Sequence, residues 1–134
     1  MTEDEVNFYC KEWLVKRGYH YKGILNKGYG QVHVPDGVNE KGVLLDHQGF
    51  KDKIPDLVWI EAKGEVVLSE LLEGFIRTVY AVYHGGGNGY LAVPHAEYEK
   101  MLEQKEFLKA VAEAVNGKGL MGLLDAEKGQ EVVL

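Results

Sequence analysis

Residues 56–63 read Asp-Leu-Val-Trp-Ile-Glu-Ala-Lys, a nearly continuous apolar run that ends in a charged pair. A short apolar run of this kind predicts a strand that is buried on both faces. Side chains alternate between the two faces of a strand, so Glu61 and Lys63 point one way and Ala62 the other. Buried charge is costly unless it is paired, so this charged pair needs a chemical reason.

The segments around this run predict an α/β chain of the α+β type, with one mixed sheet flanked by helices. Apolar side chains at helical spacing, together with Gly18 and Gly117 as stops, predict helices over residues 2–18, 69–84 and 95–116. Strands are expected within residues 42–50, 56–63 and 90–93, and a closing hairpin is expected from 120–124 and 131–134. Residues 1–134 suit one domain.

The sequence makes more detailed predictions for two of these helices. Thr2 and Glu5 have the spacing of a capping box, in which each side chain binds the backbone of the other residue. The helix over 69–84 is expected to bury one apolar stripe. The residues of that stripe are Leu72, Phe75, Ile76, Val79 and Tyr83.

Composition excludes several classes of protein. No apolar run approaches the length of a membrane span, and the acidic first residues lack the charge of a targeting leader. Cys10 is the only cysteine, which rules out disulfides within the chain and cysteine-rich zinc sites. A cytoplasmic location is therefore expected.

The net charge of -6 argues against a generic nucleic-acid binder. The charge is uneven, however. Residues 11–63 hold nine Lys and Arg against seven Asp and Glu, whereas the remainder holds six against fourteen. A metal-binding acidic cluster also counts as negative while serving a phosphate substrate, so the charge weakens a nuclease interpretation only slightly.

Metal-dependent cleavage of a phosphodiester would explain the pair at the end of the apolar run. The carboxylate of Glu61 can hold a hard divalent cation such as Mg²⁺ or Mn²⁺ through oxygen. Such an ion polarises the phosphate and lowers the pKa of a bound water. Lys63 can orient that water or stabilise the charge that develops on the phosphate oxygens. The alternative is a purely structural role, in which Glu61 and Lys63 form an ion pair at the end of a strand.

At these residues the sequence resembles the PD-(D/E)XK nuclease superfamily, which has the restriction-endonuclease-like fold. Residues 60–64, Ile-Glu-Ala-Lys-Gly, match the second half of its motif, and Pro55-Asp56 matches the first half in letters. The resemblance covers about residues 2–94. It implies a core of helix, three strands, helix and strand, to which this chain adds a C-terminal helix and hairpin. It also implies a metal-dependent nuclease, with the Ala62 carbonyl as an extra metal ligand.

The first metal-binding aspartate is the open question. On one strand Asp56 and Glu61 would lie about 16 Å apart and point to opposite faces. The superfamily places its aspartate on the preceding strand of a hairpin, where Asp46 would fold back beside Ala62. We therefore rank Asp46 first, Asp56 second and Asp36 third. A turn residue is the alternative role for both Asp46 and Asp56.

The family also contributes residues from its two helices. An acidic residue of the first helix often approaches the metals, which makes Glu5 the first candidate and Glu12 the second, although the capping box alone explains Glu5. On the helix over 69–84, Arg77 could bind a phosphate or pair with Glu73, four residues before it. His47, next to Asp46, is a further candidate at the site.

The first hypothesis is a nuclease that uses Mg²⁺ or Mn²⁺, with DNA as the expected substrate. A domain this small would need a second copy or a partner subunit to surround a duplex. The alternative is a non-catalytic module on the same fold that binds nucleic acid or protein. A third option is an interaction domain in which Glu61 and Lys63 are only structural. The glycines of 85–89 follow a helix and precede a strand, the reverse of a phosphate loop.

Overall fold

The structure is a computed structural model that describes residues 1–16 and 58–134. These residues form α1 (Glu3–Lys16), β1 (Val58–Ala62), α2 (Leu68–Gly85), β2 (Gly87–Val93), α3 (His95–Leu102), α4 (Lys105–Ala112), the 3-10 helix η3 (Glu113–Val115), β3 (Gly119–Asp125) and β4 (Gln130–Val133). The expected mixture of helices with one mixed sheet is confirmed for this part of the chain. The strand expected within residues 42–50 lies outside the described residues.

The described strands form a single sheet in the order β1-β2-β3-β4. β1, β2 and β3 run parallel, and β4 returns antiparallel to β3 as the closing hairpin. In the register, Ala62 is beside Ala92, and Val93 is beside Asp125. The carboxyl ends of the three parallel strands therefore meet at one edge of the sheet.

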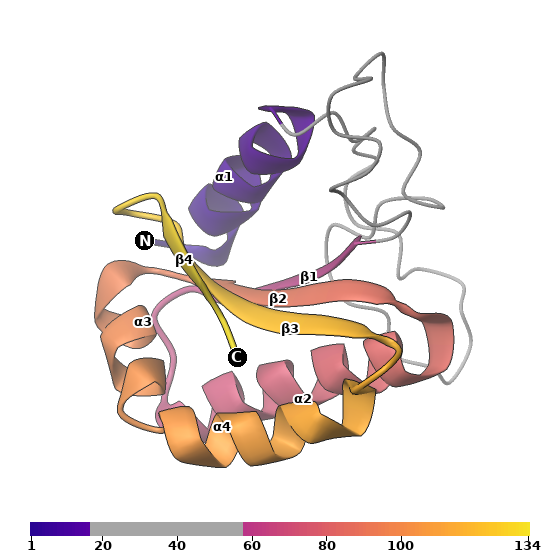
Figure 1. The fold of residues 1–134 in the computed structure, drawn as a ribbon. Helices are drawn as coiled ribbons and strands as arrows, with labels where there is room; N and C mark the ends of the chain where they lie inside the picture. The colour runs from indigo at the N-terminus through magenta and orange to yellow at the C-terminus, as the bar shows by residue number, and fades with distance from the viewer. Residues whose placement is uncertain (17–57) are drawn as a thin grey trace, which may run out of the picture.

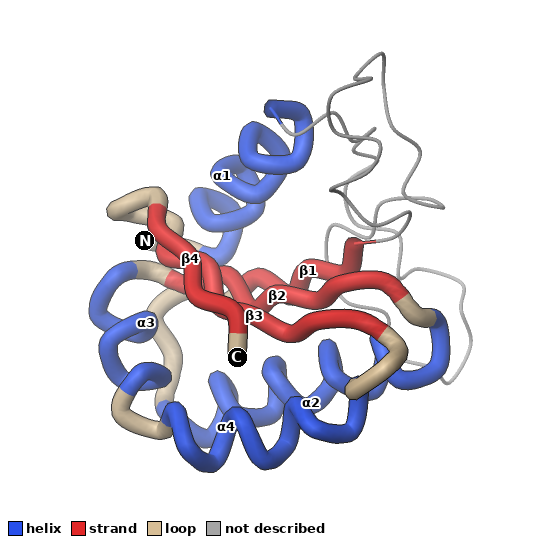
Figure 2. Tube along the Cα trace, viewed as in Figure 1, coloured by secondary structure: helices blue, strands red, loops and turns tan. Residues whose placement is uncertain are grey.

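Helices cover both faces of this sheet, as Figure 1 shows, with α1 on one face and α2, α3 and α4 on the other. Figure 2 shows the same layers, in which the strands separate α1 from the other helices. Each face has its own apolar core. Beneath α1, Val6, Cys10 and Leu14 pack with Ile60, Ala62 and Leu124. On the other face, Leu71, Phe75, Val82 and Met101 pack with Leu91 and Leu123.

The start of α1 confirms the capping box. The Thr2 backbone N–H donates to Glu5 Oε1 at 2.9 Å, and the Glu5 backbone N–H donates to Thr2 Oγ1 at 3.2 Å. Each bond satisfies a donor that a helix start would otherwise leave open. The buried positions Val6, Cys10 and Leu14 follow the helical spacing read from the sequence.

The apolar stripe expected on α2 is only partly correct. Phe75 and Val79 are buried, but Ile76 is 48% exposed and Tyr83 is 46% exposed. The buried face is rotated toward small side chains, which let the helix approach the sheet closely. That face consists of Leu71, Gly74, Phe75, Thr78, Val79, Ala81 and Val82.

The single helix expected over residues 95–116 is also wrong, because the chain breaks it into α3, α4 and η3. α3 ends at Leu102, and Gln104 leaves the helical conformation with φ -101° and ψ 18°. The break turns the chain so that α4 runs alongside α2 beneath the sheet (Figure 1). Neither proline nor glycine marks this position in the sequence.

Candidate functional site

Glu61 and Lys63 lie at the carboxyl end of β1 and face α2. Glu61 is 2% exposed and Lys63 is half-buried. A Cβ atom placed on Gly74 of α2 would lie 3.3 Å from Glu61 Cγ and 3.3 Å from Lys63 Cε. Both side chains therefore run along the same short stretch of α2. Ala62 points the other way, into the core beneath α1.

Gly74 provides the space that these two side chains use. Its missing Cβ would also lie 3.2 Å from Leu91 Cδ1, a fully buried atom of β2. Carbon atoms pack best at about 3.5–4.0 Å, so all three contacts would be tight. A glycine in the middle of a helix is unfavourable by itself, and here it lets the helix lie over a charged pair.

The ammonium group of Lys63 has no carboxylate partner within ion-pair distance among residues 1–16 and 58–134. An ion pair between Glu61 and Lys63 is thus not found in the described part of the chain. The backbone N–H of Lys63 donates to the Ala92 carbonyl at 3.0 Å, which fixes the end of β1 against β2.

The Ala62 carbonyl points away from β2. Backbone groups of successive strand residues point to alternate sides, and those of Lys63 point toward β2. The Ala62 carbonyl is therefore directed to the outer edge of β1, where none of the described strands pairs with it. That direction is the one required of a backbone ligand to an ion beside β1.

The start of α1 approaches the same end of β1. A Cβ atom on Gly64 would lie 2.7 Å from the backbone nitrogen of Glu3. Glu5 lies within the next turn and is exposed, and its carboxylate accepts the hydrogen bond of the capping box. The backbone and side chain of Thr2 lower the pKa of Glu5 by hydrogen bonding. The described contacts of Glu5 are thus explained by helix capping.

Arg77 forms an ion pair with Glu73, four residues before it on α2. Arg77 lies one helical turn beyond Gly74, because residues three apart are neighbours on a helix surface. Its side chain is 35% exposed and that of Glu73 is 56% exposed. The guanidinium group is accessible to a phosphate, which would have to compete with the Glu73 carboxylate.

Four residues named from the sequence, Asp36, Asp46, Asp56 and His47, lie outside the described residues. The position of the first aspartate therefore remains a prediction. Among residues 1–16 and 58–134, no three His, Cys, Asp or Glu side chains are grouped so that they could hold a metal ion. Glu61 is the buried carboxylate at the end of β1.

A second polar cluster, which the sequence did not suggest, lies at the same edge of the sheet. Asp125 at the end of β3 is fully buried, and its Oδ2 lies 2.6 Å from His95 Nδ1 at the start of α3. Gln130 and the backbone N–H groups of Glu127 and Lys128 donate three more hydrogen bonds to this carboxylate. Burial raises the pKa of Asp125, but these bonds outweigh it and hold the pKa below its usual value.

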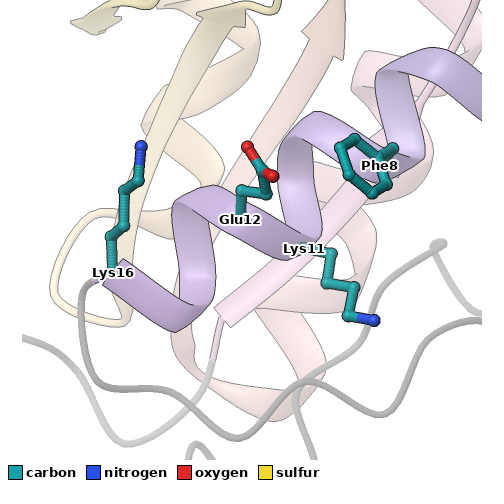
Figure 3. A pocket seen from close by; sticks show the side chains of 4 residues that line it. All are labelled: Phe8, Lys11, Glu12 and Lys16. Atoms are coloured by element: carbon teal, nitrogen blue, oxygen red, sulfur yellow. The ribbon is translucent and has the colours of Figure 1, made fainter.

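α1 carries a pocket on the side that faces away from the sheet. Figure 3 shows the residues that line it, Phe8, Lys11, Glu12 and Lys16. Phe8 is 62% exposed. Glu12, the second acidic candidate of the first helix, thus belongs to this outward side, whereas Glu61 faces α2 across the sheet.

Comparison with known proteins gives no relative. The sequence matches no protein-family model, and searches of curated proteins and of solved structures found no similar protein. Among the helices of the described residues, none has the length and apolar character needed to cross a membrane.

Proposed function

We propose that this chain is a metal-dependent nuclease with a restriction-endonuclease-like core that hydrolyses phosphodiester bonds in DNA. One observation carries the proposal: Glu61 is 2% exposed and shares the Gly74 surface of α2 with a lysine that has no described carboxylate partner. Two charged side chains placed together at the end of an apolar strand suggest a chemical role. Metal-assisted attack on a phosphate uses both groups.

The donor types at the end of β1 fit a hard divalent cation. The Glu61 carboxylate and the outward Ala62 carbonyl both offer oxygen, the ligand that Mg²⁺ and Mn²⁺ prefer. Asp46 is proposed as the further ligand. When bound, the ion would polarise the phosphate and lower the pKa of its water.

The chain's own side chains would do the remaining work. Lys63 would orient the attacking water or stabilise the negative charge that grows on the phosphate oxygens. Arg77 would bind a neighbouring phosphate of the substrate after leaving Glu73. A domain of this size covers little of a duplex, so we include a second copy or a partner subunit in the proposal.

Cleavage of plasmid and oligonucleotide DNA with Mg²⁺, Mn²⁺ or EDTA tests the proposal. Removal of a group that stabilises transition-state charge lowers rates by about 10²–10³-fold, and we expect losses of that order in Glu61→Gln and Lys63→Ala. Lys105→Ala, an exposed lysine on α4, serves as the matched control. Circular dichroism verifies folding. Folded Glu61→Gln and Lys63→Ala variants that cleave as fast as the parent would exclude the proposed site.

The same assay separates the aspartates. We expect Asp46→Asn to abolish cleavage and Asp56→Asn to leave it nearly intact, because Asp56 cannot reach a metal held by Glu61 along one continuous strand. The opposite result would make Asp56 the ligand and would require an interruption of the chain between Asp56 and β1.

The net charge of -6 favours a second candidate, a non-catalytic module on the same fold that binds nucleic acid or protein. Calorimetry with Mg²⁺ distinguishes the two. Binding that is lost in Glu61→Gln supports the nuclease, whereas the module requires no metal at this position.

A further inference from the structure

We propose that His95 and Glu99 on α3 form a second metal site, which takes a transition-metal ion such as Zn²⁺ through imidazole nitrogen and carboxylate oxygen. It is separate from the magnesium site proposed at Glu61 and does not depend on it. The proposal rests on the cluster around Asp125 and on the spacing of two ligand atoms.

Asp125 determines which nitrogen of the His95 ring carries a proton. This buried carboxylate accepts hydrogen bonds from the backbone N–H groups of Glu127 and Lys128 on Oδ1, and from the Gln130 amide on Oδ2. Its remaining contact is His95 Nδ1 at 2.6 Å. Since the carboxylate is an acceptor throughout, Nδ1 donates its N–H, which leaves Nε2 as the ring nitrogen that can bind a cation.

This nitrogen faces a second carboxylate. His95 Nε2 lies 3.3 Å from Glu99 Oε1, across one turn of α3. These two atoms can share one cation, either a proton or a metal ion. Two ligands of a tetrahedral zinc ion, with bonds of about 2.0–2.2 Å, lie about 3.3–3.5 Å apart. A charge-assisted hydrogen bond would be shorter, about 2.7–2.9 Å. The observed spacing of 3.3 Å equals that of two ligands of one zinc ion.

The surroundings match those of metal-binding histidines. Such histidines usually donate their other ring N–H to a carboxylate that fixes the ring, which is the role of Asp125 here. The side chains of His95 and Glu99 are 31% and 59% exposed, so an ion can enter. Glu127 adds a third negative charge, with its Oε1 3.3 Å from the His95 backbone nitrogen.

The ligand types define the class of ion. Imidazole nitrogen suits zinc, nickel and copper, whereas magnesium prefers oxygen ligands alone. Two protein ligands leave the other coordination positions to water. The site therefore needs no third ligand from the described residues, among which no group of three was found.

Titration of the metal-free full chain with Zn²⁺, followed by calorimetry, tests the proposal. Loss of a partner at a metal site weakens binding by about 10–100-fold, and we expect at least about tenfold in His95→Ala and in Glu99→Gln. His84→Ala and Glu103→Gln are the controls. His84 contacts the rings of Tyr80 and Tyr83 on α2, and Glu103 is an exposed carboxylate just beyond α3. We expect parental affinity in both.

Two results would overturn the site: no zinc binding by the parent, or the same affinity in the parent, His95→Ala and Glu99→Gln. A proton would then be the cation between the two side chains. Glu99→Gln changes an exposed position, so its folding, followed by circular dichroism, should match that of the parent. The titration is repeated in Glu61→Gln, where zinc affinity should persist whether or not the chain is a nuclease.

Discussion

Gly74→Ala is the substitution that most directly tests how α2 lies over Glu61 and Lys63. Alanine in place of a glycine within a helix gains about 1 kcal/mol from helix propensity. The added Cβ would lie 3.2 Å from Leu91 Cδ1 and 3.3 Å from both Glu61 Cγ and Lys63 Cε. Overpacking of a filled site costs about 1–3 kcal/mol. With about 2 kcal/mol for three such contacts, the expected result is a net loss of about 1 kcal/mol.

A double-mutant cycle isolates the part that belongs to the charged pair. Lys63→Ala removes the Cε atom from the overlap, so Gly74→Ala should be less destabilising in that background. Side chains in contact show coupling energies of about 0.5–3 kcal/mol, and we expect at least about 0.5 kcal/mol here. Urea unfolding at one pH measures the free energy of unfolding of all four proteins. The midpoints are compared with one common m-value, the dependence of that free energy on urea concentration.

Ser69→Ala, at an exposed position of α2, is the control and should change stability by less than about 0.5 kcal/mol. If Gly74→Ala instead stabilises the chain by about 1 kcal/mol and adds independently to Lys63→Ala, Glu61 and Lys63 do not lie against this turn of α2. If the chain is a nuclease, Gly74→Ala should also slow cleavage, because it displaces both side chains.

Four further substitutions address the rest of the fold. The folded-state pKa of Asp125 is lowered from 3.8. The ionised carboxylate therefore stabilises the fold above pH 3.8, and this stabilisation is lost as the pH falls through the lower pKa of the folded state. The urea midpoint of the parent should drop in this pH range, and Asp125→Asn should lack that part of the drop. Thr2→Ala should destabilise α1 by about 1 kcal/mol, whereas Glu5→Gln keeps the capping box and should leave stability unchanged. Thermal unfolding tests both variants. A loss of cleavage in a fully stable Glu5→Gln variant would show that Glu5 acts in catalysis. Trp59 Nε1 donates to the Gly86 carbonyl at 2.9 Å, so Trp59→Phe should lower stability by about 0.5–1.5 kcal/mol, and an unchanged melting temperature would contradict a contribution from this bond.

Local patterns in the sequence predicted local structure well. The helix expected over residues 69–84 is α2, Leu68–Gly85, and the apolar run before Lys63 is β1. The capping box of Thr2 and Glu5 also formed as expected. Each of these depends on residues a few positions apart. The rotation of α2 that exposes Ile76 does not, since it depends on how closely Gly74 lets the helix approach β1 and β2.

In the candidate site, too, features that depend on neighbouring residues were predicted, and features that depend on long-range packing were not. Strand alternation alone predicts that Glu61 and Lys63 share a face, because they lie two apart. His95 and Asp125 are 30 residues apart, and only the order of β2 and β3 in the sheet brings them together. Asp46 poses the same problem: the sequence predicts that a hairpin brings it near Glu61, and residue 46 lies outside the described residues. Spacing along the chain can suggest such a partner but cannot establish it.

The two separate cores have a consequence for local unfolding. Among the described helices, α1 covers one face of the sheet, whereas α2, α3 and α4 together cover the other. Proteins open in cooperative units whose free energies differ. We expect α1 to be the less stable unit, and its amide protons to exchange faster than those of α2, β2 and β3. An opening of α1 would expose Ile60 and Ala62 while Glu61 stays against Gly74, so the candidate site would survive the loss of its neighbouring layer.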